Sequence, residues 1–473
     1  MTTSTQPSEP EIKRLDARGL GLLLVLSGAL FLEGADIAML AVALPSIGAE
    51  FDLSAGGLQW VMSAYVLGYG GFLLLGGRAA DLLGRRRMFL IPLAVFVVFS
   101  GIGGLATESW MLIVARFVTG VAAAFMTPAG LSIITTGYAE GAARQKALLI
   151  YGAAGAAGYS LGLVLGGLLT LADWRWVFFA PVIMSAVILA FAVRLVPADT
   201  VQARRVLRQL DLKGAVALAT GLLLLVNTLE RASHTSLTMT LVNGVAAAAA
   251  LAAFVGIERR ASEPLVRLGI FRVGTVIRVN LVALLFSAAF FSFQFVIVLY
   301  LQELRGWSTL ETSLALLIMA IDGVLAPTLT PWLVTRFGHA PVLTAGVLAQ
   351  AAAFLLFLPM TADWSYFAML PSLVAMGLAF TLAYGTLAIA ATDGVDDSEH
   401  GLAGGLLYTA FQVGAALGLA VVSALLVAVS AGGTYALEDY RTALLVPLVA
   451  ALVAVGVSLV NALVRPQSGG ESR

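Results

Sequence analysis

Long apolar stretches, separated by short polar segments, follow one another along the chain from residue 19 to residue 464. A membrane-spanning helix needs about 20 mostly apolar residues, and lipid leaves no backbone polar group unpaired, so each long stretch predicts one helix. Membrane barrel strands would instead alternate apolar and polar positions, which these stretches do not. The pattern predicts an all-α polytopic membrane protein with fourteen helices, at residues 19–45, 58–77, 88–107, 110–137, 147–171, 174–196, 214–230, 237–257, 279–302, 308–335, 340–360, 364–392, 402–430 and 442–464.

The composition agrees with a membrane protein. Apolar residues make up 60% of the 473 positions and charged residues only 11%, whereas about a quarter of a soluble domain is charged. The sequence contains no cysteine, which excludes disulfides, thiolate metal sites and cysteine nucleophiles. The apolar stretch after Arg18 is longer than the core of a signal peptide and has no cleavage pattern, so we expect a retained first helix.

Basic residues are distributed unevenly over the predicted loops. With the N-terminus placed in the cytoplasm, 22 of the 27 Lys and Arg residues lie inside, four lie outside, and Arg116 lies within a helix. Loops rich in Lys and Arg remain in the cytoplasm. The sequence therefore predicts a multi-pass protein of the bacterial inner membrane, with both termini in the cytoplasm and no nucleic-acid partner.

Two basic cytoplasmic stretches divide the predicted helices into groups of six, two and six. They lie after the sixth and the eighth helix. The predicted parts are a cytoplasmic tail at 1–18, an N-terminal bundle at 19–196, a linker at 197–213, a two-helix insertion at 214–257, a linker at 258–278, a C-terminal bundle at 279–464 and a tail at 465–473.

One inner loop is acidic instead of basic. It contains Asp393, Asp396, Asp397 and Glu399 and no basic residue among them. Two interpretations stay open: the carboxylates are simply solvated, or they pair with the opposing basic loops and help to close the inner face.

The loop after the second predicted helix has a counterpart in the second half of the chain. It runs from Gly77 to Arg87 and includes Asp81, Gly84, Arg85 and Arg86, while the loop from Pro331 to His339 repeats its skeleton in degraded form. A glycine at each end permits a tight reversal, and the arginines anchor at an anionic leaflet. Two related six-helix halves predict a transporter with its site at their interface, near the middle of the membrane.

Five segments together resemble the major facilitator superfamily, specifically its fourteen-helix drug:proton antiporter branch. They are Gly77–Arg87 (with Ala79 and Leu82 as departures), Asp36–Pro45 (with Ala38 and Ala41 in place of polar residues), Leu112–Gly120, Gly158–Gly167 (with Leu163 where the antiporter motif has Pro) and Asp173–Phe179. The resemblance implies a major facilitator fold of two six-helix bundles with two additional helices. It also implies proton-coupled export of drugs or antibiotics by alternating access. The conformational motifs it implies contain Gly77, Asp81, Gly84, Arg85, Arg86, Gly158, Gly162, Gly166 and Gly167.

Three ionisable residues within predicted helices are candidates for proton coupling. Glu33 and Asp36 are three residues apart on the first helix and share a face. Burial and like charge both favour protonation of one carboxyl group of the pair, and Arg116 is the expected counter-ion of Asp36. We predict that Asp36 pairs with Arg116 when deprotonated and separates when a proton or cationic substrate intervenes. The alternatives are a solvated Glu33 at a water-filled mouth and a static Asp36–Arg116 pair.

Asp322 is expected near the centre of the tenth helix. Gly323, Pro327 and Pro331 follow it and loosen the helix locally. The sequence thus predicts a carboxylate that anchors a cationic substrate, a role that the resemblance also implies; a hydrogen-bonded structural Asp is the alternative. Further candidates for lining an apolar substrate cavity are Glu33, Phe291, Gln294, Tyr384, Tyr408 and Gln412.

The sequence offers no source of energy other than an ion gradient. Its three lysines, Lys13, Lys146 and Lys213, do not follow a phosphate-binding glycine loop, so an ATPase is excluded. We expect no cofactor and no metal, small-molecule and proton ligands, and a monomer in the lipid bilayer. The competing hypotheses are an exporter dedicated to one metabolite or antibiotic, a proton symporter or facilitator for uptake, and a membrane enzyme or sensor, for which no nucleophile with a spaced base is visible.

Overall fold

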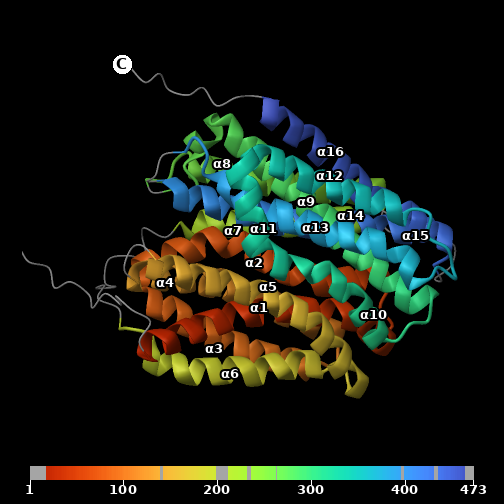
Figure 1. Cartoon of the computed structure of the whole chain (residues 1–473), viewed down its shortest axis with the longest axis horizontal. Helices are drawn as coiled ribbons and strands as arrows, with labels where there is room; N and C mark the ends of the chain where they lie inside the picture. Colours follow the sequence, from red (N-terminus) through yellow and green to blue (C-terminus); the bar gives the residue numbers. More distant parts are fainter. Residues whose placement is uncertain are drawn as a thin grey trace, which may run out of the picture.

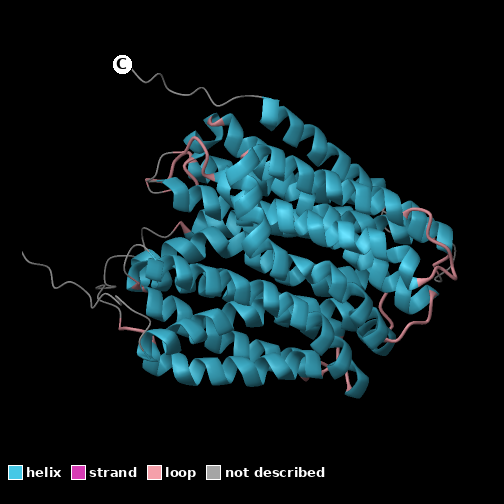
Figure 2. Cartoon of the chain, viewed as in Figure 1, coloured by secondary structure: helices cyan, strands magenta, loops and turns pink. Residues whose placement is uncertain are grey.

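A computed structural model describes residues 17–138, 142–198, 211–231, 236–262, 264–395, 399–430 and 435–463. Its elements are helices joined by short loops (Figure 2). Within the described residues, fourteen helical spans are long and apolar enough to cross a membrane, which confirms the predicted number. The predicted all-α class is therefore correct.

The N-terminal half consists of six helices in the lower part of Figure 1. Pairs of them pack along their length, chiefly α1 with α5, α2 with α4, and α3 with α4 and α6. The bounds are α1 (Ala17–Phe51), α2 (Ala55–Leu83), α3 (Arg85–Gly104), α4 (Ser109–Gly137), α5 (Ala142–Ala172) and α6 (Trp176–Leu195).

A row of glycines lets α5 lie directly on α1. A side chain at Gly158 would meet the backbone carbonyl of Phe31, and one at Gly162 would meet the backbone of Ala35. Gly166 lies against Met39 in the same way. Small residues that let two backbones approach are typical of membrane helix pairs, so this part of the motif is explained by packing within one half.

Most of the C-terminal half occupies the upper part of Figure 1, while its second span reaches down beside α5; the half repeats the six spans with two of them interrupted. Its elements are η2 (Leu268–Arg272), α9 (Gly274–Leu299), η3 (Tyr300–Leu304), α10 (Thr309–Leu316), η4 (Leu317–Ile321), α11 (Asp322–Phe337), α12 (His339–Phe357), α13 (Tyr366–Ala391), α14 (His400–Val429), α15 (Leu437–Ala443) and α16 (Leu445–Leu463). The predicted tenth helix is thus broken: the short 3₁₀ segment η4 separates α10 from α11, and Asp322 is the first residue after it.

Two helices lie between the halves along the chain, at the residues predicted for the insertion. They are α7 (Leu212–Arg231) and α8 (Leu237–Glu258), which pack on each other. Helix α7 also packs on α2 of the N-terminal half and α14 of the C-terminal half, so it lies where the two halves meet (Figure 1).

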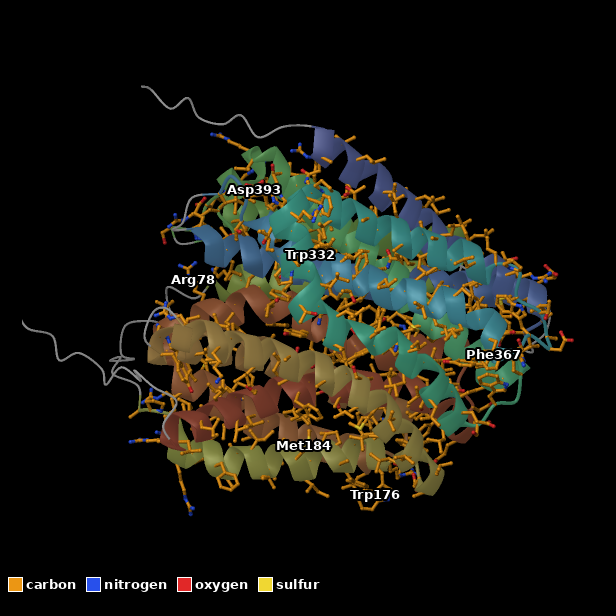
Figure 3. The ribbon with its side chains drawn as sticks, viewed as in Figure 1. Arg78, Trp176, Met184, Trp332, Phe367 and Asp393 are labelled. Carbon is orange, nitrogen blue, oxygen red and sulfur yellow. The ribbon has the colours of Figure 1, made fainter. Side chains whose placement is uncertain are left out.

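The two halves meet along two pairs of helices, α2 with α14 and α5 with α10. On the first pair, the Cα of Gly70 faces the side chain of Gln412; on the second, Gly167 lies against Ser313. We call the end of the bundle with the start of α1 and Arg78 the basic end. Figure 3 shows Arg78 and Asp393 at this end and Phe367 at the other, which we call the far end.

The connection between α2 and α3 differs from the loop predicted after Gly77. Helix α2 continues through Gly77 to Leu83, so Gly77 does not make the turn. Gly84 alone separates the helices, with a φ of 104°, and Gly338 separates α11 from α12 in the same way with a φ of 84°. Positive φ angles suit glycine because it lacks a Cβ. Gly84 in the first loop and Gly338 in its counterpart therefore carry the reversals.

Candidate functional site

A buried ion pair lies within the N-terminal half. Arg116, on α4, donates from Nη1 to Oδ2 of Asp36 on α1, the counter-ion predicted from the sequence. Both side chains are only 3% exposed. Two opposite charges removed from water stabilise each other strongly, and removing either one leaves an uncompensated buried charge.

Tyr65 of α2 forms the third member of this group. Its ring centroid lies 4.4 Å from the Arg116 guanidinium carbon, a cation–π distance. The Tyr65 hydroxyl and Arg116 Nε are buried and have no hydrogen-bond partner among the described residues. A small cavity reaches Arg116 and Tyr65 and is bounded on the opposite half by Phe291 of α9 and Leu419 of α14. The ion pair therefore faces the interface between the halves.

Glu33 has hydrogen-bond partners of its own, although its carboxyl group lies close enough to Asp36 to interact with it. Its Oε2 accepts a hydrogen bond of 2.5 Å from Thr127 Oγ1 of α4, and Tyr69 of α2 also lies beside the carboxyl group. Tyr151 of α5 donates to the Thr127 carbonyl oxygen at 3.3 Å. The two carboxyl groups interact with each other, as expected, but have different hydrogen-bond partners: Asp36 accepts from a guanidinium and Glu33 accepts from a hydroxyl group.

Asp322 lies where the tenth span is interrupted. Its carboxylate accepts from the backbone at the N-terminus of α11, where the helix dipole favours negative charge. Tyr159 of α5 lies close to both Asp322 and Gln294 of α9. The Tyr159 hydroxyl and Gln294 Oε1 are buried without a hydrogen-bond partner among the described residues. This second polar group joins α5 of one half to α9 and α11 of the other.

Aromatic residues of the C-terminal half line the space beside these carboxylates. Tyr384 of α13 and Tyr408 of α14 have ring centroids 6.5 Å apart and, with Phe411, line one cavity. They are 39% and 41% exposed although they lie well inside their helices. Gln412 instead packs on Gly70 at the α2–α14 contact, so the structure places it in an interface between helices.

The residues of the expected conformational motifs lie at the basic end and along α5. Arg85 donates to Thr136 Oγ1 at 2.6 Å, and Arg86 donates to the carbonyl oxygens of Val193 and Val196, also at 2.6 Å. Both arginines thus join α3 to neighbouring helices of the same half. The side chain of Asp81 lies outside the described part of the structure. Gly167 alone among the motif glycines of α5 lies against the C-terminal half, at Ser313.

Within the acidic loop, two carboxylates have basic neighbours. Glu399 lies 3.6 Å from Arg267, and Asp393 lies 3.3 Å from His339. Asp396 and Asp397 lie outside the described residues. One carboxylate of the acidic loop is therefore paired with the basic linker, while a role of this pairing in closing the inner face stays a prediction.

Sequence reasoning missed five residues that complete these groups. They are Tyr65, Tyr69, Thr127, Tyr151 and Tyr159. Burying a hydroxyl group in a membrane helix costs much less free energy than burying a charge, so a Thr or Tyr in a helix does not by itself indicate a functional site. The spacing of Tyr65 and Tyr69, four residues apart on one helix face, was the available signal.

Comparison with known proteins gives consistent results. The family model described as Major Facilitator Superfamily matches residues 26–419 and 331–471. The cephamycin export protein CmcT of Amycolatopsis lactamdurans is 34% identical over 404 residues, covering 83% of this chain and 82% of the relative. The puromycin resistance protein pur8 of Streptomyces alboniger is 34% identical over 442 residues, covering 90% and 84%. A solved POT family transporter in complex with 5-aminolevulinic acid aligns with a TM-score of 0.69 at 14% identity, over 94% of this chain and 96% of that one, and supports the fold.

Proposed function

The chain belongs to the Major Facilitator Superfamily and is a membrane transporter, not an enzyme, and from this premise we propose that it exports lipophilic, cationic drugs or antibiotics in exchange for protons. Export is supported by the names of its relatives, which are an export protein and a resistance protein. Proton exchange is supported by the site itself.

The observation that carries the proposal is the buried Asp36–Arg116 pair beside a cavity between the halves. A proton on Asp36 neutralises the carboxylate and weakens its attraction for the guanidinium. Arg116 then keeps only the ring of Tyr65 as a stabilising neighbour. Because this exchange of partners takes place at the interface, it can be linked to how the halves meet. The pair therefore couples protonation to alternating access.

Glu33 and Asp322 support a cationic substrate. Neither carboxylate forms an ion pair with a basic side chain among the described residues. A substrate cation would supply the missing positive charge, and the faces of Tyr384 and Tyr408 would hold its apolar part. A proton that competes with the cation for Glu33 would release the substrate. The tyrosines and the two carboxylates together fit an amphipathic cation better than an anion.

The positive-inside rule supports an orientation with the basic end in the cytoplasm of a bacterial cell. One elementary charge moving across about 100 mV releases about 2.3 kcal/mol, which corresponds to a roughly fifty-fold concentration gradient. One or two protons for each cycle would then sustain extrusion without a nucleotide.

Everted membrane vesicles test the proposal with a quaternary ammonium dye as the probe. An exporter accumulates the dye when the vesicle interior is acidified, whereas a symporter of the same orientation loses it. We expect Asp36→Asn to abolish the proton-driven accumulation while dye exchange without a gradient persists. Glu438→Gln, an exposed carboxylate at the far end with a side chain 75% exposed, is the matched control. Unchanged proton-driven accumulation in Asp36→Asn would exclude this residue as the proton carrier.

An exporter dedicated to one antibiotic is the second candidate. The observation that favours it is that both relatives carry the name of a single antibiotic. A panel of chemically unrelated cationic dyes distinguishes the two candidates, because a dedicated exporter would confer resistance to one compound class only.

A further inference from the structure

The two extra helices end at the basic end with a pair of acidic residues. Asp211 immediately precedes α7, and its Oδ1 accepts a hydrogen bond of 2.8 Å from the Gly214 amide, so it caps that helix. Glu258 is the last residue of α8, and its Oε2 accepts 3.0 Å from the amide of Val266. One carboxylate thus begins the insertion and the other ends it.

The remaining oxygen of each carboxyl group is directed at the other. Asp211 Oδ2 and Glu258 Oε1 are both buried and have no other donor among the described residues. Both flank the Cα of Gly214: a Cβ added there would lie 2.8 Å from the first oxygen and 2.6 Å from the second. The two side chains interact directly with each other. Two carboxyl groups whose facing oxygens are buried repel each other when both are ionised, whereas one proton between these oxygens forms a strong hydrogen bond.

The surroundings of this pair are mostly apolar. Glu258 itself is only 3% exposed. The charged group that faces it from the N-terminal half is Arg78 of α2, which donates 2.7 Å to the carbonyl oxygen of Pro264; Lys213 and Arg259, the neighbours in sequence, are exposed. Val266, which donates to Glu258, belongs to one apolar cluster from α2, α7, the segment before α9, α9 and α14: Leu75, Ala79, Ala215, Leu265, Val266, Ile270, Val276, Ala403 and Leu406.

The segment 264–273 therefore connects three parts of the molecule. Glu258 holds it to the insertion through Val266, Arg78 holds it to the N-terminal half through Pro264, and the apolar cluster holds it to α14. A change in charge at the carboxyl pair acts on this connection directly, because the Glu258 side chain contacts both Asp211 and the Val266 amide.

We propose that Asp211 and Glu258 form a second proton-binding site, in which one proton lies between Glu258 Oε1 and Asp211 Oδ2 and keeps the insertion attached to segment 264–273. Loss of this proton to solvent leaves two adjacent carboxylates, whose repulsion separates α7 from the end of α8 and frees Val266. The attachment is thus complete at low pH and weakens as the pH rises. This site does not depend on Asp36 or on the direction of transport.

Glu258→Gln separates this proposal from a purely structural role. The amide nitrogen replaces the shared proton as a donor to Asp211, and the amide oxygen still accepts from Val266. The variant therefore imitates the protonated pair but cannot lose its proton. Glu258→Ala leaves the Val266 amide without an acceptor, and Glu438→Gln is the matched exposed control.

Infrared spectroscopy of the full-length protein in lipid nanodiscs measures the proton directly. At neutral pH we expect the carbonyl band of a protonated carboxylic acid in the wild-type protein to be reduced in Glu258→Gln and unchanged in Glu438→Gln. An identical band in wild type and Glu258→Gln would overturn the proposal.

Thermal unfolding of the same samples at increasing pH measures the consequence. We expect wild type to lose stability relative to Glu258→Gln as the pH rises, and Glu258→Ala to unfold at lower temperature throughout. Parallel pH profiles for wild type and Glu258→Gln would contradict the shared proton. If added Ca²⁺ stabilised the wild-type protein but not Glu258→Gln, this result would also contradict the shared proton, because it would indicate a metal site.

Discussion

The guanidinium of Arg116 lies between a charge and a ring: it donates to Asp36 and its central carbon is 4.4 Å from the centroid of Tyr65. The Tyr65 hydroxyl, by contrast, is buried without a partner among the described residues. The contributions of the ring and of the hydroxyl group of Tyr65 to stabilising the Arg116 guanidinium can therefore be separated by substitution. When Asp36 is protonated, the ring becomes the main group that stabilises the buried cation.

Substitutions at Tyr65 test the contribution of the ring. We expect Tyr65→Phe to retain proton-driven efflux, because the ring remains and the lost hydroxyl has no partner. Tyr65→Leu removes an interaction worth about 2 kcal/mol in a desolvated site, or roughly 30-fold in an equilibrium constant. Initial rates of dye efflux at equal protein levels measure the difference. Equal losses of efflux rate in Tyr65→Phe and Tyr65→Leu would show that the hydroxyl group, not the ring, contributes to transport.

The stability of variants at Arg116 tests whether its charge is balanced by Asp36. Arg116→Gln leaves the buried Asp36 carboxylate without a cation and should destabilise the protein by about 3–5 kcal/mol. The double variant with Asp36→Asn removes both charges and should recover most of this loss, while proton coupling stays absent. Chemical unfolding in detergent provides the measurement. A double variant no more stable than Arg116→Gln would contradict a direct charge balance.

Glu33→Gln tests the role of this residue in cation recognition. The amide oxygen can still accept from Thr127, so the variant should fold, but it carries no negative charge for a substrate. We expect the apparent affinity for a quaternary ammonium dye to fall about tenfold, as for the loss of a contact worth about 1.4 kcal/mol, and the affinity for a neutral substrate to change little. Binding is measured by fluorescence titration, with Thr127→Val as a variant that retains the charge. Equal losses for cationic and neutral ligands would exclude charge recognition.

Asp322→Asn addresses the second carboxylate. An additional positive charge on the ligand needs an additional negative partner, so resistance to divalent cations should fall more than resistance to monovalent ones. Minimum inhibitory concentrations for paired mono- and bis-quaternary compounds measure this selectivity. Equal loss for both classes, or no loss for either, would count against recognition by Asp322.

Two glycines of α5 should respond in opposite ways to replacement by alanine, because only one of them lies against α1. Gly158→Ala places a methyl group against the backbone carbonyl of Phe31 and should destabilise the protein by about 1–3 kcal/mol. Gly152→Ala lies on the same helix with no atom within 4 Å, so it should be neutral or stabilise by roughly 0.5–1 kcal/mol through helix propensity. The midpoint of thermal unfolding distinguishes them. A neutral Gly158→Ala would show that α1 and α5 separate easily.

Much of the candidate site could be inferred from the sequence because charges are costly in a membrane. Asp36 and Arg116 are conspicuous within apolar stretches, and each needs a partner of opposite sign. The interruption of the tenth span was only partly predicted. The prolines that indicated a loosened helix follow Asp322, whereas the break lies directly before it. The hydroxyl groups around Glu33 were not foreseen because Thr and Tyr occur in membrane helices for many reasons.

The sequence by itself determined the class, the fourteen spans and the family resemblance, because apolar length and the cost of unpaired backbone and buried charge are properties of each segment alone. Only the tertiary structure decided which polar groups meet. It gave Glu33 and Asp36 different hydrogen-bond partners, moved Gly77 from the turn into a helix, and placed Asp211 against Glu258 across the insertion. These contacts depend on how helices pack and rotate against each other, which small residues permit but do not specify from one segment alone.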